Sequence, residues 1–136
     1  MQLALQYLII GLGGALGSML RFGLGSWIDA GATKAGPIFP YGTIIVNITG
    51  CFIIGFIATM SSPDGRWMLS SNTRNFIMIG ILGGYTTFSS FSLQTLLLAQ
   101  DGQWWGAAAN VTLSLVLCLA GVWLGAAAAG MMNQMR

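Results

Sequence analysis

The stretch "GGYTTFSSFS", residues 83–92, interrupts a run that otherwise has the composition of a membrane-spanning helix. It places two glycines, five serine and threonine hydroxyls and two phenylalanines where a lipid-facing helix carries leucines. Adjacent glycines weaken a helix, and irregular backbone at membrane depth is tolerated only where protein or a water-filled cavity covers it. We therefore expect a membrane helix that is broken at Gly83 and Gly84, with a covered site beside the break.

The composition of the whole chain supports a membrane location. Of 136 residues, 55% are hydrophobic and 6% are charged, whereas a soluble domain carries about 25% charged residues. A bilayer core requires roughly 20 apolar residues per helix, and four runs meet this length, at about 3–28, 41–60, 76–99 and 104–131. The sequence predicts an all-α integral membrane protein, one four-helix domain over residues 1–136, whose first span is retained and is not a cleaved signal peptide.

The loop charges bear on membrane orientation. With four spans, both termini and the second loop share one side, which holds Arg66, Arg74 and Arg136. The other side holds Lys34, and Arg21 if that residue lies towards the end of its helix. Such a balance gives almost no positive-inside bias, so we expect insertion in both orientations, which would allow oppositely oriented copies to pair into an antiparallel dimer. The net charge of +2 is too small and too scattered for a nucleic-acid partner.

Two pairs of glycines have the spacing of helix-packing motifs. Gly13 and Gly17 form one GxxxG pattern, and Gly121 and Gly125 form the other. In lipid, small residues at this spacing allow helix backbones to approach closely. We interpret both pairs as packing positions.

Several kinds of membrane chemistry lack their residues in this chain. It contains no glutamate and no histidine, and its three acids, Asp29, Asp64 and Asp101, lie at span ends or in loops. A proton-coupled exporter of cationic drugs requires a buried carboxylate, and nucleophilic catalysis requires a base, so we expect no enzyme. Cys51 and Cys118 fall in apolar runs without CxxC spacing, which favours buried, inert thiols over a disulfide or a zinc site.

Neutral hydrogen-bonding residues remain at membrane depth. Asn47 lies near the middle of the second span with Thr43 one turn before it, and Ser114 lies in the fourth span. A single Ser or Thr in a membrane helix usually bonds to its own preceding turn. Asn47 is costlier to bury, and the sequence leaves open whether it joins helices or contacts a ligand.

The residues after the glycines favour an anion. Phe88 and Phe91 are spaced i, i+3 and share one face, while Thr87 and Ser90 form a hydroxyl pair on an adjoining face. An aromatic ring is electropositive at its edge, so two ring edges beside neutral donors make a weak anion site. A weak site suits conduction, because the ion must also leave. Ordinary packing of the two phenylalanines is the alternative interpretation, and freed carbonyls near "GGYT" are a possible cation site.

The chain resembles the Fluc fluoride channels, also called the CrcB family, along essentially its whole length. The resemblance rests on "GGALGSMLRFGLG" (13–25), "PYGTIIVNITGCFIIG" (40–55), "GILGGYTTFSSFS" (80–92) and "NVTLSLVLCLAG" (110–121). The third of these motifs is the most specific.

The resemblance implies an antiparallel, dual-topology homodimer in the plasma (inner) membrane that exports fluoride passively through two pores and so relieves fluoride toxicity. It implies a pore lined by Asn47, Phe88 and Phe91, with a polar track that includes Thr87, Ser90, Ser114 and Thr43. It places Arg21 at a vestibule. It also implies a structural sodium ion between the two subunits, held by the backbone carbonyls of Gly83 and Thr86.

Two alternatives come from other classes of protein. A small multidrug-type exporter shares four short spans and antiparallel pairing, but the missing intramembrane carboxylate argues against it. A structural four-span subunit of a larger complex would conduct no ion by itself. Fluoride efflux from liposomes that contain the pure protein distinguishes all three.

Overall fold

The computed structural model describes residues 2–32 and 39–135, so the expectations for Lys34 and Arg136 lie outside the described residues. Four helical runs are long and apolar enough to cross a membrane. They are α1 (Gln2–Ala32), α2 (Tyr41–Met60), α6 (Trp104–Gln134), and a composite third run over residues 71–100. The third run consists of α3 (Ser71–Asn75), the π-helix η1 (Phe76–Leu82), α4 (Gly83–Tyr85) and α5 (Phe88–Gln100). The predicted four-span, all-helical fold with an interrupted third helix is confirmed.

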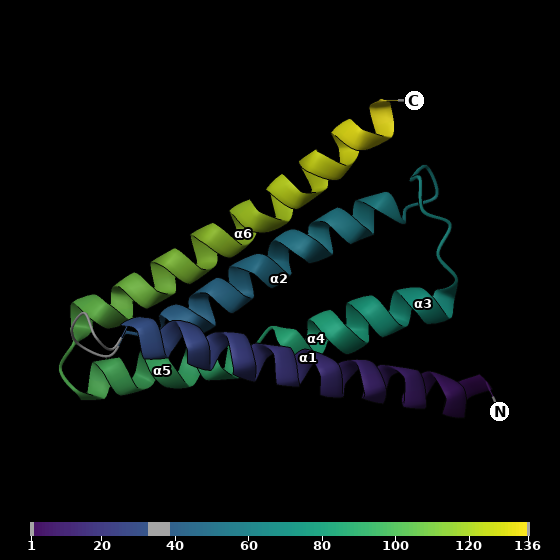
Figure 1. The fold of residues 1–136 in the computed structure, drawn as a ribbon. Coiled ribbons are helices and arrows are strands. Elements are labelled where there is room, and N and C mark those ends of the chain that lie inside the picture. The colour runs from purple at the N-terminus through teal and green to yellow at the C-terminus, as the bar shows by residue number, and fades with distance from the viewer. Residues whose placement is uncertain (1, 33–38, 136) are drawn as a thin grey trace.

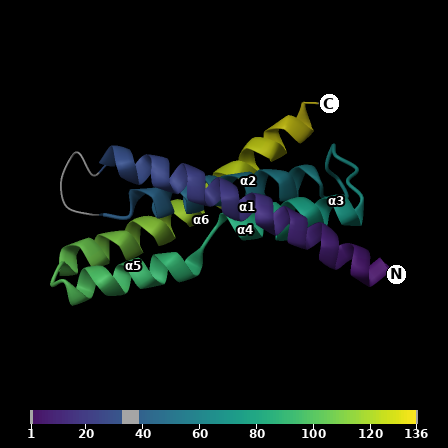
Figure 2. The same ribbon diagram turned by 60° about the horizontal axis from the view of Figure 1, so that its bottom comes forward.

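The four runs alternate in direction. Helices α2 and α6 lie side by side and run the same way, while α1 and the third run cross in the opposite direction (Figure 1). The N-terminus, the C-terminus and the segment between α2 and α3 lie at one end of the molecule, as Figure 2 also shows. This is the arrangement that an even number of crossings requires.

Glycines hold α6 against α2 at backbone distance. A Cβ atom on Gly125 would overlap the carbonyl oxygen of Phe52, and one on Gly55 would overlap the carbonyl oxygen of Val122. A Cβ atom on Gly121 would lie 3.1 Å from the carbonyl oxygen of Ile48. The packing role expected for Gly121 and Gly125 is confirmed, because no larger residue fits this seam without moving a helix.

The first glycine pair holds α1 against the third run. A Cβ atom on Gly17 would overlap the carbonyl oxygen of Ile81, and one on Gly13 would lie 2.9 Å from the Cα atom of Gly80. Gly84 makes a comparable approach, since its Cβ atom would lie 2.9 Å from the Cα atom of Gly14. The GxxxG pattern at Gly13 and Gly17 is therefore also a packing motif.

Local signals account for several helix ends. The turn between α5 and α6 contains Gly102 with a φ of 74°, a conformation that favours glycine. The Asp29 carboxylate, near the end of α1, accepts a hydrogen bond of 2.8 Å from the N–H of Gly42 in the first turn of α2. A negative charge at a helix N-terminus is stabilising, so this bond ties α1 to α2 at one end of the molecule.

The break in the third run does not lie at the glycines, so that expectation is wrong. Gly83 is helical, with φ −65° and ψ −35°, and Gly84 belongs to α4. The extended residues are Thr86, with ψ 156°, and Thr87, with φ −151° and ψ 114°. Gly83 and Gly84 remain helical because the helical conformation places Gly84 against α1. The extended backbone of Thr87, in contrast, is stabilised by a side chain from α2.

Candidate functional site

That side chain belongs to Asn47, which binds both polar groups of the Thr87 backbone. Its Oδ1 accepts a hydrogen bond of 2.7 Å from the N–H of Thr87, and its Nδ2 donates one of 3.0 Å to the Thr87 carbonyl oxygen. Both residues are buried. The amide thus replaces the helical hydrogen bonds that the break removes, and we call this pair of bonds the Asn47 clamp.

The clamp frees one carbonyl group, and the start of α5 frees another. In a regular helix the N–H of Thr87 would bond to the carbonyl of Gly83, and the N–H of Ser90 to that of Thr86. The Thr87 N–H instead bonds to Asn47, and the Ser90 N–H donates to the Thr87 Oγ1 at 3.2 Å. The carbonyl oxygens of Gly83 and Thr86 therefore lose their regular helical donors, which fits their predicted role as ligands of a cation.

A cluster of hydroxyls marks the start of α5. The Thr87 side chain caps the helix by accepting the bond from the Ser90 N–H, and its own hydroxyl donates to the Ser90 Oγ at 3.1 Å. The Ser89 Oγ lies 3.2 Å from the Thr87 Oγ1. Several hydroxyls are thus gathered at a helix N-terminus, where the positive end of the helix dipole favours negative charge.

One cavity adjoins the break on the side of α6, and we call it the phenylalanine cavity. Its volume is about 210 Å³. The predicted pore residues that line it are Asn47, Thr87, Phe88, Phe91 and Ser114. The rings of Phe88 and Phe91 are in contact, with centroids 5.2 Å apart and planes inclined at 50°. The described lining contains hydroxyl, amide, thiol and apolar side chains and no charged residue.

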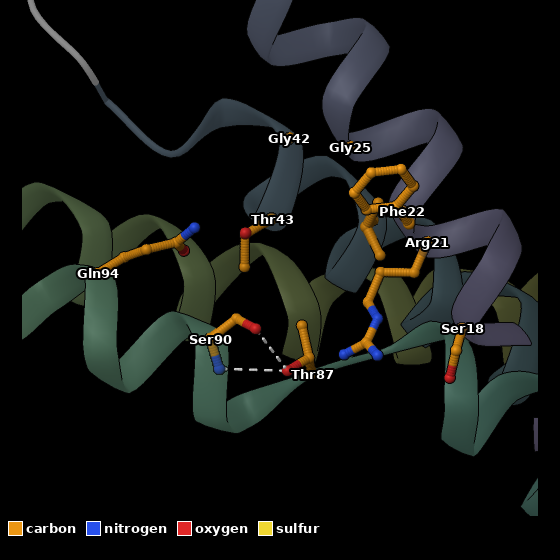
Figure 3. A pocket seen from close by; sticks show the side chains of 10 residues that line it. Ser18, Arg21, Phe22, Gly25, Gly42, Thr43, Thr87, Ser90 and Gln94 are labelled. Carbon is orange, nitrogen blue, oxygen red and sulfur yellow. Dashed lines mark hydrogen bonds between the residues drawn. The ribbon is translucent and has the colours of Figure 1, made fainter.

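A second cavity, of about 280 Å³, lies between α1, α2 and α5, and we call it the Arg21 cavity. Arg21, Thr43, Thr87 and Ser90 line it, as do Gln94 and Ser18 (Figure 3). In Figure 3 the Arg21 guanidinium extends from α1 towards the start of α5, where Thr87 and Ser90 lie. A fixed positive charge and a helix N-terminus at one cavity both favour an anion.

The structure divides the predicted polar residues between the two cavities. Thr43 and Ser90 line only the Arg21 cavity, Ser114 lines only the phenylalanine cavity, and Thr87 lines both. Among the described residues, neither lining contains a carboxylate. The Asn47 clamp lies where the two cavities approach each other, so the two possibilities left open for Asn47 are compatible: it joins helices and it also lines a cavity.

Sequence reasoning missed two polar side chains of the Arg21 cavity, those of Ser18 and Gln94. The Oε1 of Gln94 is buried and has no hydrogen-bond partner among the described residues. A signal for Gln94 was present, because it follows Thr87 and Ser90 at i+7 and i+4 and so shares their helix face. Ser18 precedes Arg21 by three residues on α1, which is the same kind of signal.

Asn110 is the first residue of the motif at 110–121, where the sequence indicated a role for Ser114 alone, and it is fully buried. Its Nδ2 donates to the Thr95 Oγ1 at 2.8 Å, and the Ser114 hydroxyl lies 3.5 Å from its Oδ1. Thr95 donates in turn to the Phe91 carbonyl oxygen at 2.8 Å. Asn110 therefore connects the two helices that carry Ser114 and Phe91, and its i−4 spacing from Ser114 placed it on the same face.

Tyr85 is a further residue that the sequence did not single out. It is buried immediately before the break, and its hydroxyl lies 2.9 Å from the Thr49 Oγ1 on α2. Thr49 also donates back to the Ile45 carbonyl oxygen, the usual behaviour of a threonine in a membrane helix. Together with the Asn47 clamp, this contact fixes both sides of the break to α2.

Fold and site together define a small multi-pass membrane protein with a broken helix, a neutral cavity lined by hydrogen-bond donors and phenyl rings, and a second cavity that carries Arg21. Residues 8–126 match the family described as CrcB-like protein, Camphor Resistance (CrcB). The chain belongs to this family, which confirms the resemblance seen in the sequence.

Several relatives are similar over nearly their whole length. A protein of Opitutus terrae named fluoride-specific ion channel FluC is 54% identical over 130 residues, covering 96% of each chain. One of the same name from Rhodospirillum rubrum is 55% identical and covers 96% of this chain and 98% of its own. A third, from Paramagnetospirillum magneticum, is 48% identical over 130 residues.

Proposed function

We propose that the protein is a fluoride-selective ion channel that lets fluoride leave the cell passively across the plasma (inner) membrane. The observation that carries this proposal is the phenylalanine cavity, where neutral donors and two phenyl rings adjoin a broken helix. The names of the relatives support fluoride as the ion and a channel, not an enzyme, as the class of protein.

The lining of the two cavities suits a small anion in transit. The phenylalanine cavity offers hydroxyl and amide donors and ring edges, so it attracts an anion without holding it by a formal charge. Arg21 and the N-terminus of α5 supply positive potential at the Arg21 cavity, where an anion loses part of its water shell. A weak site beside an attractive vestibule permits both entry and release.

A second copy of the chain is proposed to complete the pore. Phe88 is 73% exposed in the single chain, and Gly83, Ser89 and Ser92 are exposed beside the break. Polar and irregular backbone at this depth has to be covered by protein, and the balanced loop charges favour an antiparallel partner. A homodimer of this kind would contain two pores, one for each broken helix.

The freed carbonyls support a structural sodium ion at the centre of that dimer. Gly83 and Thr86 would each direct a carbonyl oxygen to it, and the partner subunit would supply an equivalent pair. Oxygen ligands without formal charge suit a monovalent cation, whereas a divalent ion would normally require carboxylates. The ion would neutralise the mutual repulsion of the four carbonyl dipoles and so hold the subunits in register.

The test is fluoride efflux from liposomes that contain only this protein, measured with a fluoride electrode after a potassium ionophore is added. We expect rapid efflux of fluoride, and no efflux of chloride from matched chloride-loaded liposomes followed with a chloride electrode. Protein-free liposomes provide the background. Absence of fluoride efflux from dimeric, folded protein would exclude the proposal and favour a structural subunit, and efflux that requires a proton gradient would favour a coupled exporter.

Replacing either phenylalanine by isoleucine is expected to reduce fluoride flux strongly. Isoleucine is apolar and bulky but lacks the electropositive ring edge. The two variants should differ in stability, because Phe91 is 8% exposed whereas Phe88 is 73% exposed. Phe91→Ile should lower the melting temperature of the subunit in detergent. Phe88→Ile removes little packing within the subunit, so any loss of stability should come from the contact with the second copy. Full efflux from both variants would contradict the ring-edge site.

Gly83→Val is expected to weaken the dimer without unfolding the subunit. Within one chain a Cβ atom at Gly83 meets only the Met78 carbonyl oxygen, at 3.8 Å. A loss of dimer on size-exclusion chromatography would therefore report crowding between subunits near the sodium site. Gly23→Val on α1 is the matched control, since its Cβ atom has no neighbour within 4 Å. Equal dimer content in both variants would place Gly83 outside the interface.

Added lysines at one terminus should fix a single orientation and stop transport. The physical reason is that extra positive charge near a span end is retained on the cytoplasmic side, which leaves no antiparallel partner. Co-expression of a second version with lysines in the loop between α1 and α2 should restore transport. Full activity of one fixed orientation by itself would exclude the antiparallel dimer.

A further inference from the structure

The two cysteines of the chain meet in the wall of the phenylalanine cavity. Cys51 on α2 and Cys118 on α6 both line this cavity, at a level where these two helices pack against each other. Both are free and half-buried, so they are more accessible than the buried, inert thiols expected from the sequence. Gly121, one turn from Cys118, lets α6 approach α2 here, since its Cβ atom would lie 3.1 Å from the Ile48 carbonyl oxygen and 3.7 Å from the Cβ of Cys51.

We propose that Cys51 and Cys118 form a two-thiol binding site for a soft divalent d¹⁰ cation of the mercuric type, and that the bound ion obstructs the anion path. The proposal rests on the channel function proposed above. Sulfur ligands select soft metal ions, and two ligands from neighbouring helices suit a metal that accepts linear coordination.

The binding reaction balances without an oxidant. Mercuric chloride and two thiols give one sulfur–mercury–sulfur bridge, two protons and two chloride ions. Two thiolates neutralise the divalent metal, so the bridge adds no net charge to a cavity whose described lining is uncharged. Mercuric chloride is itself neutral in chloride buffer and reaches the site through the lipid, without entering a path that repels cations.

The position of the pair gives the bound metal its effect. Asn47 precedes Cys51 by four residues on α2, and Ser114 precedes Cys118 by four residues on α6. Each cysteine is thus one helical turn from a hydrogen-bonding residue that lines the same cavity. A metal that bridges the sulfurs narrows the cavity beside Asn47 and Ser114 and fixes α2 to α6 at this level.

The test combines a binding count with a flux measurement on the intact protein. Because Cys51 and Cys118 are the only cysteines of the chain, the double variant Cys51→Ser with Cys118→Ser is a complete control. Mass spectrometry is expected to find one mercury atom per unmodified chain after mercuric chloride, two methylmercury groups after methylmercury chloride, and neither in the double variant. Liposomes with the unmodified protein should lose most of their fluoride efflux, and a dithiol should restore it.

Each contrary result removes a defined part of the proposal. Two mercuric ions per chain would show that the thiols react separately and do not form a joint site. The obstruction would be excluded if mercuric chloride reduced the flux of the double variant by the same fraction as that of the unmodified protein. Full flux from a chain that carries the mercury bridge would exclude it as well. The number of mercury atoms found by mass spectrometry does not depend on transport. If the protein carried no fluoride at all, the proposed function would be refuted, and the mass measurement would still test the two-thiol site.

Discussion

Asn47→Asp is expected to abolish fluoride flux and to destabilise the broken helix at the same time. The carboxylate of the variant still accepts the hydrogen bond from the Thr87 N–H. Its second oxygen, however, takes the place of the Nδ2 donor, which in the unmodified protein lies 3.0 Å from the Thr87 carbonyl oxygen. Leaving a buried carbonyl without its donor costs about 1–3 kcal/mol. The new negative charge also lies on the wall of the phenylalanine cavity and repels the anion.

Two companion variants separate these effects. Asn47→Leu removes both bonds of the clamp and adds no charge, so it should lower the melting temperature and impair flux through disorder at the break. Asn72→Asp makes the matched change at an exposed position on α3 and should leave both quantities unchanged. If Asn47→Leu kept full stability and flux, the clamp would be unimportant. Full efflux from Asn47→Asp at neutral pH would remove Asn47 from the path.

Gly125→Ala is the second change for which we expect a large effect. The added methyl group would overlap the Phe52 carbonyl oxygen. That oxygen belongs to a helix and cannot turn aside as a side chain would, so α6 has to move away from α2. Overpacking of this kind typically costs about 1–3 kcal/mol. The shift would also carry Ser114 away from Asn47, so flux should fall together with thermal stability in detergent.

Gly130→Ala on the same helix is the control for Gly125→Ala. Its Cβ atom has no neighbour within 4 Å. In a helix, alanine is more favourable than glycine by about 1 kcal/mol, so this variant should be neutral or slightly stabilised. We therefore expect the melting temperature to fall for Gly125→Ala and to stay the same or rise for Gly130→Ala. This difference separates the effect of the backbone contact from that of helix propensity. Equal melting temperatures for Gly125→Ala and Gly130→Ala would show that the seam between α2 and α6 accommodates a methyl group.

Periodic and compositional features of the fold were predictable from the sequence. Four apolar runs of membrane length gave the spans, and the two GxxxG patterns gave the glycine seams, because both depend on spacing within one helix. The interruption of the third span was predicted as well. Its position was wrong because helix propensity alone pointed to Gly83 and Gly84, whereas the energy of the break depends on a side chain 40 residues away in the sequence.

The site was predictable only in part, because spacing within one helix shows in the sequence but packing between helices does not. Residues that share a face, such as Phe88 with Phe91, could be grouped from their spacing. Which faces meet depends on how the helices pack, so the sequence could not divide Thr43 and Ser90 from Ser114, nor bring Arg21 to the start of α5. The contact of Tyr85 with Thr49 also joins two helices and left no local signal.

The π-helix η1 has a consequence for the angular phase of the third span. A wide turn takes up one more residue than an α-helix over the same path. Compared with an uninterrupted α-helix of the same number of residues, it therefore changes the angular position of the residues before it relative to those after it. If residues 76–82 kept their number but were α-helical, Arg74 would turn by about 100° around the axis relative to Gly84. The length of the span would hardly change. The wide turn therefore sets the side of the helix on which the Arg74 charge meets the membrane surface, independently of the face that packs on α1.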